Sequence, residues 1–283
     1  MSVPFSFEVF PPKKDMPVDV IYNTLDQLSD LKPEFISVTC GAGGSSANAG
    51  NRMIEVASAI KNKYNRRAVA HVPCINLSKD DVTDMLKELD RADIHDILAL
   101  RGDRVPGVEP KEDFPHAADL IKFIRHRTDR KFKIYAACYP EVHTEAPDFD
   151  TDLNYLKEKV ETGVDGLISQ LFFDNNAFYY FRDRARAIGI DVPIDAGIMP
   201  VTKKSQIERM VNICGAKLPV KFRRILDKYG DNNDALREAG IVYALNQIVD
   251  LLANGVDGIH LYVMNNVYVA RRISESVQKL LEA

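Results

Sequence analysis

The sequence predicts an α/β fold, a (β/α)8 TIM barrel in which eight parallel strands close into a ring with helices outside it, built as a single domain. Short β-rich runs alternate with stretches of helical period along the 283 residues. The first seven runs begin about 30 residues apart, the length of one βα unit. Several runs are almost continuously apolar, as expected for parallel strands covered on both faces. The chain length is also typical of this barrel.

The eight expected strands are rich in the β-branched and aromatic residues that favour extended backbone. Two prolines, Pro11 and Pro12, follow the first of them and end it. In chain order the strands are Phe5–Phe10, Phe35–Cys40, Ala68–Ile75, Ile97–Gly102, Lys133–Tyr139, Gly166–Phe173, Ala196–Val201 and Gly258–Met264.

The segments between the strands have helical period. In Val18–Leu31, the residues Ile21, Leu25, Leu28 and Leu31 form one apolar stripe. The gap between the seventh and eighth strands is longer than the others, so one or two extra helices are expected there. This gap holds Lys203–Cys214, Pro219–Tyr229 and Ala235–Ala253, and a last helix, Val267–Leu281, closes the chain.

An open doubly wound sheet is the alternative fold. A dinucleotide-binding sheet of that kind carries a glycine fingerprint after its first strand, and none is present here. The glycine-rich loop Gly41–Gly44 follows the second strand instead, and Ser46 stands where a third glycine would be. The loop is therefore not a dinucleotide fingerprint, its structural explanation is a tight βα turn, and the barrel is favoured.

Composition indicates a soluble globular protein. Apolar residues make up 46% and charged residues 28%, with a formal net charge of -4, which disfavours nucleic acid and anionic membranes as partners. No apolar run reaches membrane length, and the early first strand leaves no room for a signal peptide. The four cysteines, Cys40, Cys74, Cys138 and Cys214, lack metal-site spacing, so reduced thiols and no metal site are expected.

The first strand carries an ionisable residue between apolar ones. Side chains alternate along a strand, so Glu8 shares one face with Ser6 and Phe10. At a sheet edge this carboxylate would be solvated, but a closed barrel has no edge and turns one face of every strand inward. Burial raises the pKa of a carboxyl and makes it a proton donor near neutral pH. The barrel therefore favours a buried acid beneath the mouth where such active sites form.

Further polar residues follow the other strands at the same rim, and together they exceed what a bare scaffold needs. Each also has a structural explanation: a core histidine, a local ion pair at a turn, or a solvated helix face for Lys159, which could instead neutralise a phosphate. The group comprises Thr39, His71, Arg101 with Gly102 and Asp103, Tyr139 with His143, Gln170, and the helical stripe Asp152, Tyr155, Leu156 and Lys159.

Several motifs follow one another in order through nearly the whole length of the chain. The most specific of these are Phe7-Glu8-Val9-Phe10-Pro11-Pro12, Arg101-Gly102-Asp103 and Tyr139-Pro140-Glu141-Val142-His143. The accompanying segments are Leu31-Lys32-Pro33, Ser37-Val38-Thr39, Ala99-Leu100, Ala137, Gln170 with Phe172-Phe173-Asp174, and Gly197-Ile198-Met199-Pro200-Val201. With these motifs the chain resembles the methylenetetrahydrofolate reductases in their short bacterial form.

The resemblance implies a flavin enzyme that reduces 5,10-methylenetetrahydrofolate to 5-methyltetrahydrofolate with NADH or NADPH, by a ping-pong mechanism, in one-carbon metabolism and methionine biosynthesis. It implies that Glu8 is the general acid toward the bridging nitrogen of the folate and that Asp103 lies between flavin and pterin. Gln170 and Gln206 would contact substrate. The implied FAD-binding residues are Thr39, Cys40, Gly41, Ala42, His71, Arg101, Gly102, Asp103, Ala117, Ala137, Tyr139, His143, Ala146, Asp152 and Lys159.

The family also implies a cytoplasmic homo-oligomer. Since the chain ends with the last barrel helix, we expect neither a C-terminal regulatory domain nor feedback by S-adenosylmethionine. Four positions depart from the family pattern: Cys40 replaces an aromatic residue, Tyr155 and Glu158 replace an asparagine and a basic residue, and Asn266 replaces an arginine. Two alternatives remain open, a flavin and folate-binding barrel that needs a partner protein for electrons, and another FAD barrel oxidoreductase of the proline dehydrogenase type.

Overall fold

A computed structural model describes residues 2–12, 16–40, 47–103, 107, 109–128 and 130–283. Eight strands, hydrogen-bonded in sequence order, close into a parallel barrel, which confirms the predicted fold class. The strands are β1 (Phe5–Val9), β2 (Ile36–Val38), β3 (Ala68–Pro73), β4 (Asp96–Leu100), β5 (Lys133–Cys138), β6 (Gly166–Ser169), β7 (Ile194–Ile198) and β8 (Gly258–Tyr262).

Helices follow the strands as the periodicity predicts, with three between β7 and β8. The predicted helix Val18–Leu31 differs in detail, because its first turn is a 3-10 helix. The helices are η1 (Val18–Ile21), α1 (Tyr22–Ser29), α2 (Ala47–Asn62), α3 (Lys79–Arg91), α4 (Ala117–Thr128), α5 (Phe149–Glu161), α6 (Asn175–Ala187), α7 (Lys204–Cys214), α8 (Val220–Tyr229), α9 (Asn233–Ala253) and α10 (Val267–Leu281).

The sixth strand is shorter than its apolar run. It was expected to reach Phe173, but β6 ends at Ser169. Beyond it, Leu171 and Phe173 are buried against residues of α7, α8 and α9, including Ile207, Phe222 and Tyr243. The segment after Ser169 is therefore a loop, and its residues are apolar because helices α7, α8 and α9 cover them.

The chain groups into two compact units. The N-terminal unit comprises Ser6–Ala137 and Glu158–Leu167, and the C-terminal unit comprises Met1–Phe5, Cys138–Lys157 and Ile168–Ala283. That the chain acts as one domain stays a prediction. Within the described residues, none of the helices is both long and apolar enough to cross a membrane.

In the N-terminal unit, parallel registers run from β1 to β5. Glu8 lies opposite Ser37, and His71 lies opposite Leu98. The helices between these strands bury apolar faces. For example, α3 buries Val82, Leu86 and Leu89, and its first turn is closed by a capping box between Ser78 and Asp81.

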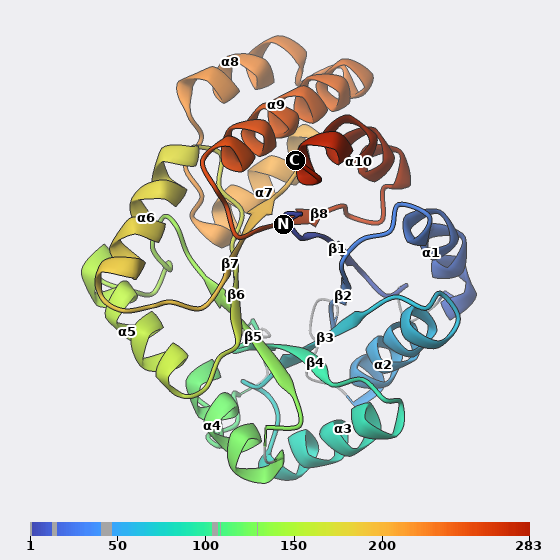
Figure 1. Cartoon of the computed structure of the whole chain (residues 1–283), viewed down its shortest axis with the longest axis vertical. Helices are drawn as coiled ribbons and strands as arrows, with labels where there is room; N and C mark the ends of the chain where they lie inside the picture. Colours follow the sequence, from blue (N-terminus) through green and yellow to red (C-terminus); the bar gives the residue numbers. More distant parts are fainter. Residues whose placement is uncertain (1, 13–15, 41–46, 104–106, 108, 129) are drawn as a thin grey trace. The chain divides into compact units, whose positions relative to one another are not determined.

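In the C-terminal unit, β7 pairs with β8, and α8, α9 and α10 follow one another closely in space (Figure 1). Gly197 on β7 is required for close packing, because a Cβ there would lie 2.1 Å from the Ser169 carbonyl oxygen. The Gly197 amide donates to Ser169 Oγ over 2.9 Å, and Tyr262 Oη donates to the Ser169 carbonyl over 2.7 Å. These bonds join β6, β7 and β8 inside the unit.

Candidate active site

Glu8 lies in the middle of β1, and its side chain is buried with only 8% of its surface exposed. The flanking strand residues are buried as well, so the carboxyl is shielded from most of the bulk water. Desolvation raises the pKa of Glu8 to about 8. At neutral pH this group is therefore mostly a neutral carboxylic acid, able to donate a proton.

The imidazole of His71 faces this acid from β3. Glu8 Oε2 and His71 Nε2 are 3.4 Å apart, and His71 is only 6% exposed. Burial lowers the pKa of His71 to about 3, so the imidazole is neutral at neutral pH. Sequence reasoning assigned His71 to the cofactor alone and missed its contact with Glu8. The only sequence signal for this contact was that both residues could lie on the inward faces of their strands, β1 and β3.

The end of β2 lies next to the same histidine. The Thr39 amide donates to the Val9 carbonyl over 3.1 Å, and Cys40 Sγ donates to the His71 carbonyl over 3.1 Å. Burial raises the pKa of Cys40 to about 12, so this thiol is neutral. Gly41 and Ala42, also predicted to contact the cofactor, lie outside the described residues.

The turn after β4 is held by backbone hydrogen bonds. The Ile75 amide donates to the Arg101 carbonyl over 2.8 Å. Gly102 follows with a φ of +85°, and a Cβ at this position would lie 2.9 Å from Pro73 Cβ. Both the backbone conformation and the close approach therefore favour glycine. Asp103 comes next, and its side chain is exposed.

Lys159 on α5 reaches the carboxyl end of β5. Its Nζ donates to the Ala137 carbonyl over 2.6 Å, which places a cation at the end of this strand in the N-terminal unit. Ala117, the remaining predicted cofactor residue of this unit, is the first residue of α4 and is partly buried.

In the C-terminal unit, the segment after β5 brings four predicted residues together. The rings of Tyr139 and His143 meet edge to face with centroids 4.6 Å apart. The His143 amide donates to Asp152 Oδ2 over 2.8 Å, and the Ala146 amide donates to the His143 carbonyl over 2.9 Å. Between Tyr139 and His143, Val142 has a φ of +79°, which is strained for a β-branched residue and typical of functional loops.

The two predicted substrate glutamines bond within their own segments of the C-terminal unit. Gln170 Oε1 accepts from the Leu171 amide over 2.9 Å. Gln206 Oε1 accepts from the Thr202 amide over 3.3 Å and from Thr202 Oγ1 over 3.2 Å. In both side chains the oxygen is engaged, which orients the amide nitrogen away from these bonds.

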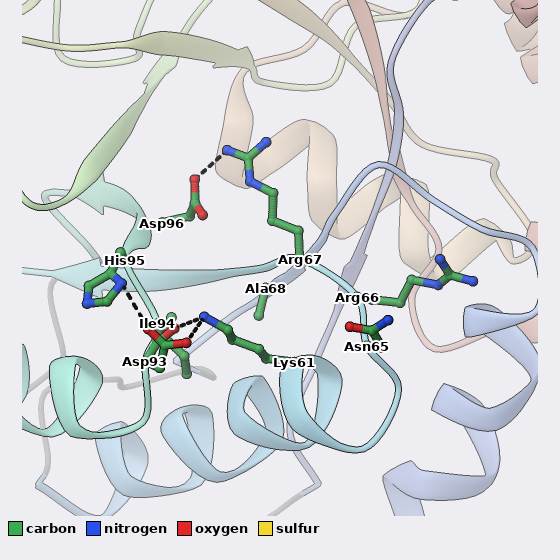
Figure 2. Close-up of a pocket in the computed structure, with 9 residues that line it drawn as sticks. All are labelled: Lys61, Asn65, Arg66, Arg67, Ala68, Asp93, Ile94, His95 and Asp96. Atoms are coloured by element: carbon green, nitrogen blue, oxygen red, sulfur yellow. Dashed lines mark hydrogen bonds and ion pairs between the residues drawn. The ribbon is translucent and has the colours of Figure 1, made fainter.

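A separate pocket of about 230 Å³ opens at the amino ends of β3 and β4, beside Ala68 and Asp96 (Figure 2). Four of its charged groups form two ion pairs: Lys61 with Asp93 at 2.6 Å, and Arg67 with Asp96. It lies at the opposite ends of these strands from His71 and Arg101 and contains none of the predicted site residues. In the described part of the chain, no group of three His, Cys, Asp or Glu side chains could hold a metal ion.

Comparison with known proteins places this geometry in a family. The family model described as methylenetetrahydrofolate reductase matches residues 1–278. The chain belongs to the methylenetetrahydrofolate reductase family. The Escherichia coli K12 protein named 5,10-methylenetetrahydrofolate reductase is 33% identical over 272 residues, covering 96% of this chain and 90% of that protein. This match confirms the resemblance to the short bacterial form.

The plant relatives of this reductase family are longer. Methylenetetrahydrofolate reductase (NADH) 1 of Arabidopsis thaliana is 35% identical over 274 residues, covering 92% of this chain and 46% of that protein. The chain thus spans about half the length of the plant relatives it matches.

Solved structures show the same fold at low sequence identity. One is an uncharacterised protein from Clostridium thermocellum that binds two copies of 5-methyl-5,6,7,8-tetrahydrofolic acid, with a TM-score of 0.67, 12% identity, and 97% and 96% of the two chains covered. Another is a Coxiella burnetii dihydropteroate synthase with pteroic acid, with a TM-score of 0.54, 11% identity, and 100% and 94% covered.

Two of the four positions that are expected to depart from the family pattern, Asn266 and Cys40, make local contacts in the structure. Asn266 caps α10, because its Oδ1 accepts from the Val269 amide over 3.2 Å. Cys40 bonds to the His71 carbonyl, as described above. Tyr155 and Glu158 are exposed on α5. At position 266, where the resemblance leads us to expect an arginine, this chain therefore has a helix cap.

Proposed function

We propose that this protein reduces 5,10-methylenetetrahydrofolate to 5-methyltetrahydrofolate, with bound FAD and with NADH or NADPH as the reductant. Family membership supports the reaction. The observation that carries the proposal is Glu8, a buried carboxyl that is neutral at neutral pH. Reductive opening of the folate ring needs such an acid, because the bridging nitrogen must leave as an amine.

Glu8 has one step in this scheme. It donates its proton to the bridging nitrogen, the bond from that nitrogen to the one-carbon unit breaks, and the one-carbon unit becomes an iminium that accepts hydride. Glu8 is then a buried carboxylate and recovers a proton from water before the next turnover. The overall reaction consumes one proton and one hydride per folate.

The residues of the N-terminal unit fit FAD. The Lys159 ammonium at the end of β5 suits a diphosphate, and Gly102 keeps the backbone after β4 free of a side chain. The remaining FAD contacts that we assign to this unit come from small side chains, polar side chains and backbone groups. They belong to Thr39, Cys40, His71, Arg101, Asp103, Ala117 and Ala137. In the C-terminal unit, the cluster of Tyr139, His143, Ala146 and Asp152 is assigned to the same cofactor. When bound, FAD would carry the hydride from the nicotinamide to the folate, and the two substrates would bind to it in turn.

Asp103, Gln170 and Gln206 are assigned to the folate as part of this proposal. The exposed carboxylate of Asp103 is available to a pterin, whose ring carries several N–H donors. The names of the plant relatives specify NADH, which makes this the first reductant to test. We also propose that the protein is a cytoplasmic homo-oligomer and that its product, 5-methyltetrahydrofolate, is used in methionine biosynthesis.

The test uses the purified protein with FAD added. We expect a yellow protein that NADH or NADPH bleaches anaerobically, that methylenetetrahydrofolate reoxidises, and that releases 5-methyltetrahydrofolate detectable by mass spectrometry. A yellow protein inert to both nicotinamides would favour a barrel that needs an electron-delivering partner. A protein that takes up no FAD would refute the proposal.

A further inference from the structure

His71 Nε2 is a buried polar atom without a hydrogen-bond partner in the described structure. It forms no hydrogen bond of good geometry within the described structure, and Glu8 Oε2 lies 3.4 Å from it. Buried polar groups in native proteins are almost always hydrogen-bonded, so an exception of this kind indicates a site with a function.

Protonation decides which of the two groups can donate. A carboxylate and a neutral imidazole with its proton on Nδ1 would place two acceptors against each other. An ion pair would require two buried charges, and burial disfavours the charged form of both groups. A protonated Glu8 facing an unprotonated Nε2 satisfies both atoms without a charge.

Three described neighbours of the pair, on or after β2 and on β4, are uncharged. From the end of β2, the neutral thiol of Cys40 contacts the His71 carbonyl. From β4, the residue opposite His71 is Leu98, and from β2 the residue opposite Glu8 is Ser37.

We propose that His71 is a positioning residue: its Nε2 accepts a hydrogen bond from protonated Glu8 and holds that proton in place until the substrate nitrogen takes it. This inference rests on the proposed function for the identity of the substrate, but the hydrogen bond itself does not depend on it. A hydrogen bond made by the neutral acid stabilises the neutral acid, so His71 makes Glu8 a weaker acid than burial alone would.

The first test reads the hydrogen bond without any substrate. In ¹⁵N-histidine NMR spectra of the purified protein with FAD, the signals absent from His71→Asn identify His71. We expect a neutral imidazole with its proton on Nδ1 and an Nε2 shifted as a hydrogen-bond acceptor, unchanged from pH 6 to 7.5. A proton on Nε2, or an imidazolium at pH 7, would overturn the proposal.

The second test measures the pH midpoint of folate reduction in enzyme whose flavin is already reduced. We expect His71→Leu to lower this midpoint by about half to one pH unit, a three- to tenfold change in proton affinity. His71→Gln, whose amide oxygen reaches the place of Nε2, should hold the midpoint close to that of the wild type. A purely structural role predicts no shift, and a purely apolar effect of leucine predicts a rise.

The two tests separate this inference from the proposed function. If the protein shows the expected Nε2 signal but reduces no folate, the hydrogen-bonded pair is supported and the proposed reaction is refuted. If the protein reduces folate while His71 carries its proton on Nε2, the reaction is supported and the proposed role of His71 is refuted.

Discussion

Lys159 on α5 donates a hydrogen bond to the Ala137 carbonyl over 2.6 Å, which fixes an ammonium group at the end of β5. If this group neutralises the FAD diphosphate, Lys159→Met should weaken FAD binding about tenfold or more, the usual cost of one charge-assisted hydrogen bond. Ultrafiltration with flavin fluorescence measures the dissociation constant. Lys122→Met, on the exposed face of α4, is the matched control and should leave it unchanged. Equal affinity in both variants would remove Lys159 from the cofactor site.

Gly102 and Gly189 form a matched pair, because both have a φ of +85°. At Gly189 a Cβ meets nothing within 4 Å, whereas at Gly102 it lies 2.9 Å from Pro73. Gly189→Ala should therefore lower the free energy of unfolding by about 1 kcal/mol, the cost of the backbone conformation alone. Gly102→Ala should cost about 1–3 kcal/mol more through overpacking. Urea denaturation measures both, and equal costs would mean that the turn moves freely away from Pro73.

The cap of α10 predicts the effect of removing the Asn266 side chain. Its Oδ1 accepts from the Val269 amide, so Asn266→Ala should lower the free energy of unfolding by about 1 kcal/mol. Asn266→Asp keeps the cap and should cost less. Asn246→Ala, at an exposed position inside α9, is the control and should be neutral or slightly stabilising, since alanine is the better helix former. If thermal unfolding ranks the variants otherwise, the cap is not stabilising.

Burial of Glu8 also predicts how stability depends on pH. Its pKa rises from 4.5 in the unfolded chain to about 8 in the folded one, so the folded state binds the extra proton between these values. The stability that Glu8 contributes is full below about pH 4.5 and falls by about 1.4 kcal/mol per pH unit as the pH rises toward 8. Glu8→Gln should therefore gain about 3 kcal/mol relative to the wild type between pH 5.5 and 7.5.

Urea unfolding at the two pH values measures this difference, with Glu55→Gln, on an exposed part of α2, as the control that should not gain. His71 acts in the opposite direction, because its lowered pKa removes stability as the pH falls from 6.5 toward 3. A difference between Glu8→Gln and wild type that stays constant with pH would show that Glu8 is not perturbed by burial.

The strand pattern could be predicted from the sequence because parallel strands covered on both faces are continuous apolar runs. The ends of the strands were harder to predict from the sequence. Leu171 and Phe173 extend such a run beyond β6, and only the presence of α7, α8 and α9 explains their burial. Local sequence cannot distinguish a buried loop from a strand when tertiary packing supplies the burial.

For the candidate site, sequence could predict the acid but not its neighbour. Alternation along β1 and closure of the barrel together predict that Glu8 is buried, and it is. The contact with His71 depends on the register of β1, β2 and β3 and on two side-chain rotamers, which no local pattern determines. The sequence predicted the start of the last helix at Val267, and asparagine directly before a helix is a usual N-cap, so the cap at Asn266 could have been predicted but was missed.

The most direct test of the assigned acid compares the two half-reactions of Glu8→Gln by stopped-flow absorbance of the flavin. Only the folate half-reaction needs a proton from Glu8, so we predict that NADH reduces the flavin of this variant at close to the wild-type rate. Reoxidation by methylenetetrahydrofolate should be slower by a factor of about 100 or more, whereas Glu55→Gln should match the wild type in both steps. Equal slowing of both half-reactions, or normal folate reduction by Glu8→Gln, would contradict the role of Glu8 as the general acid.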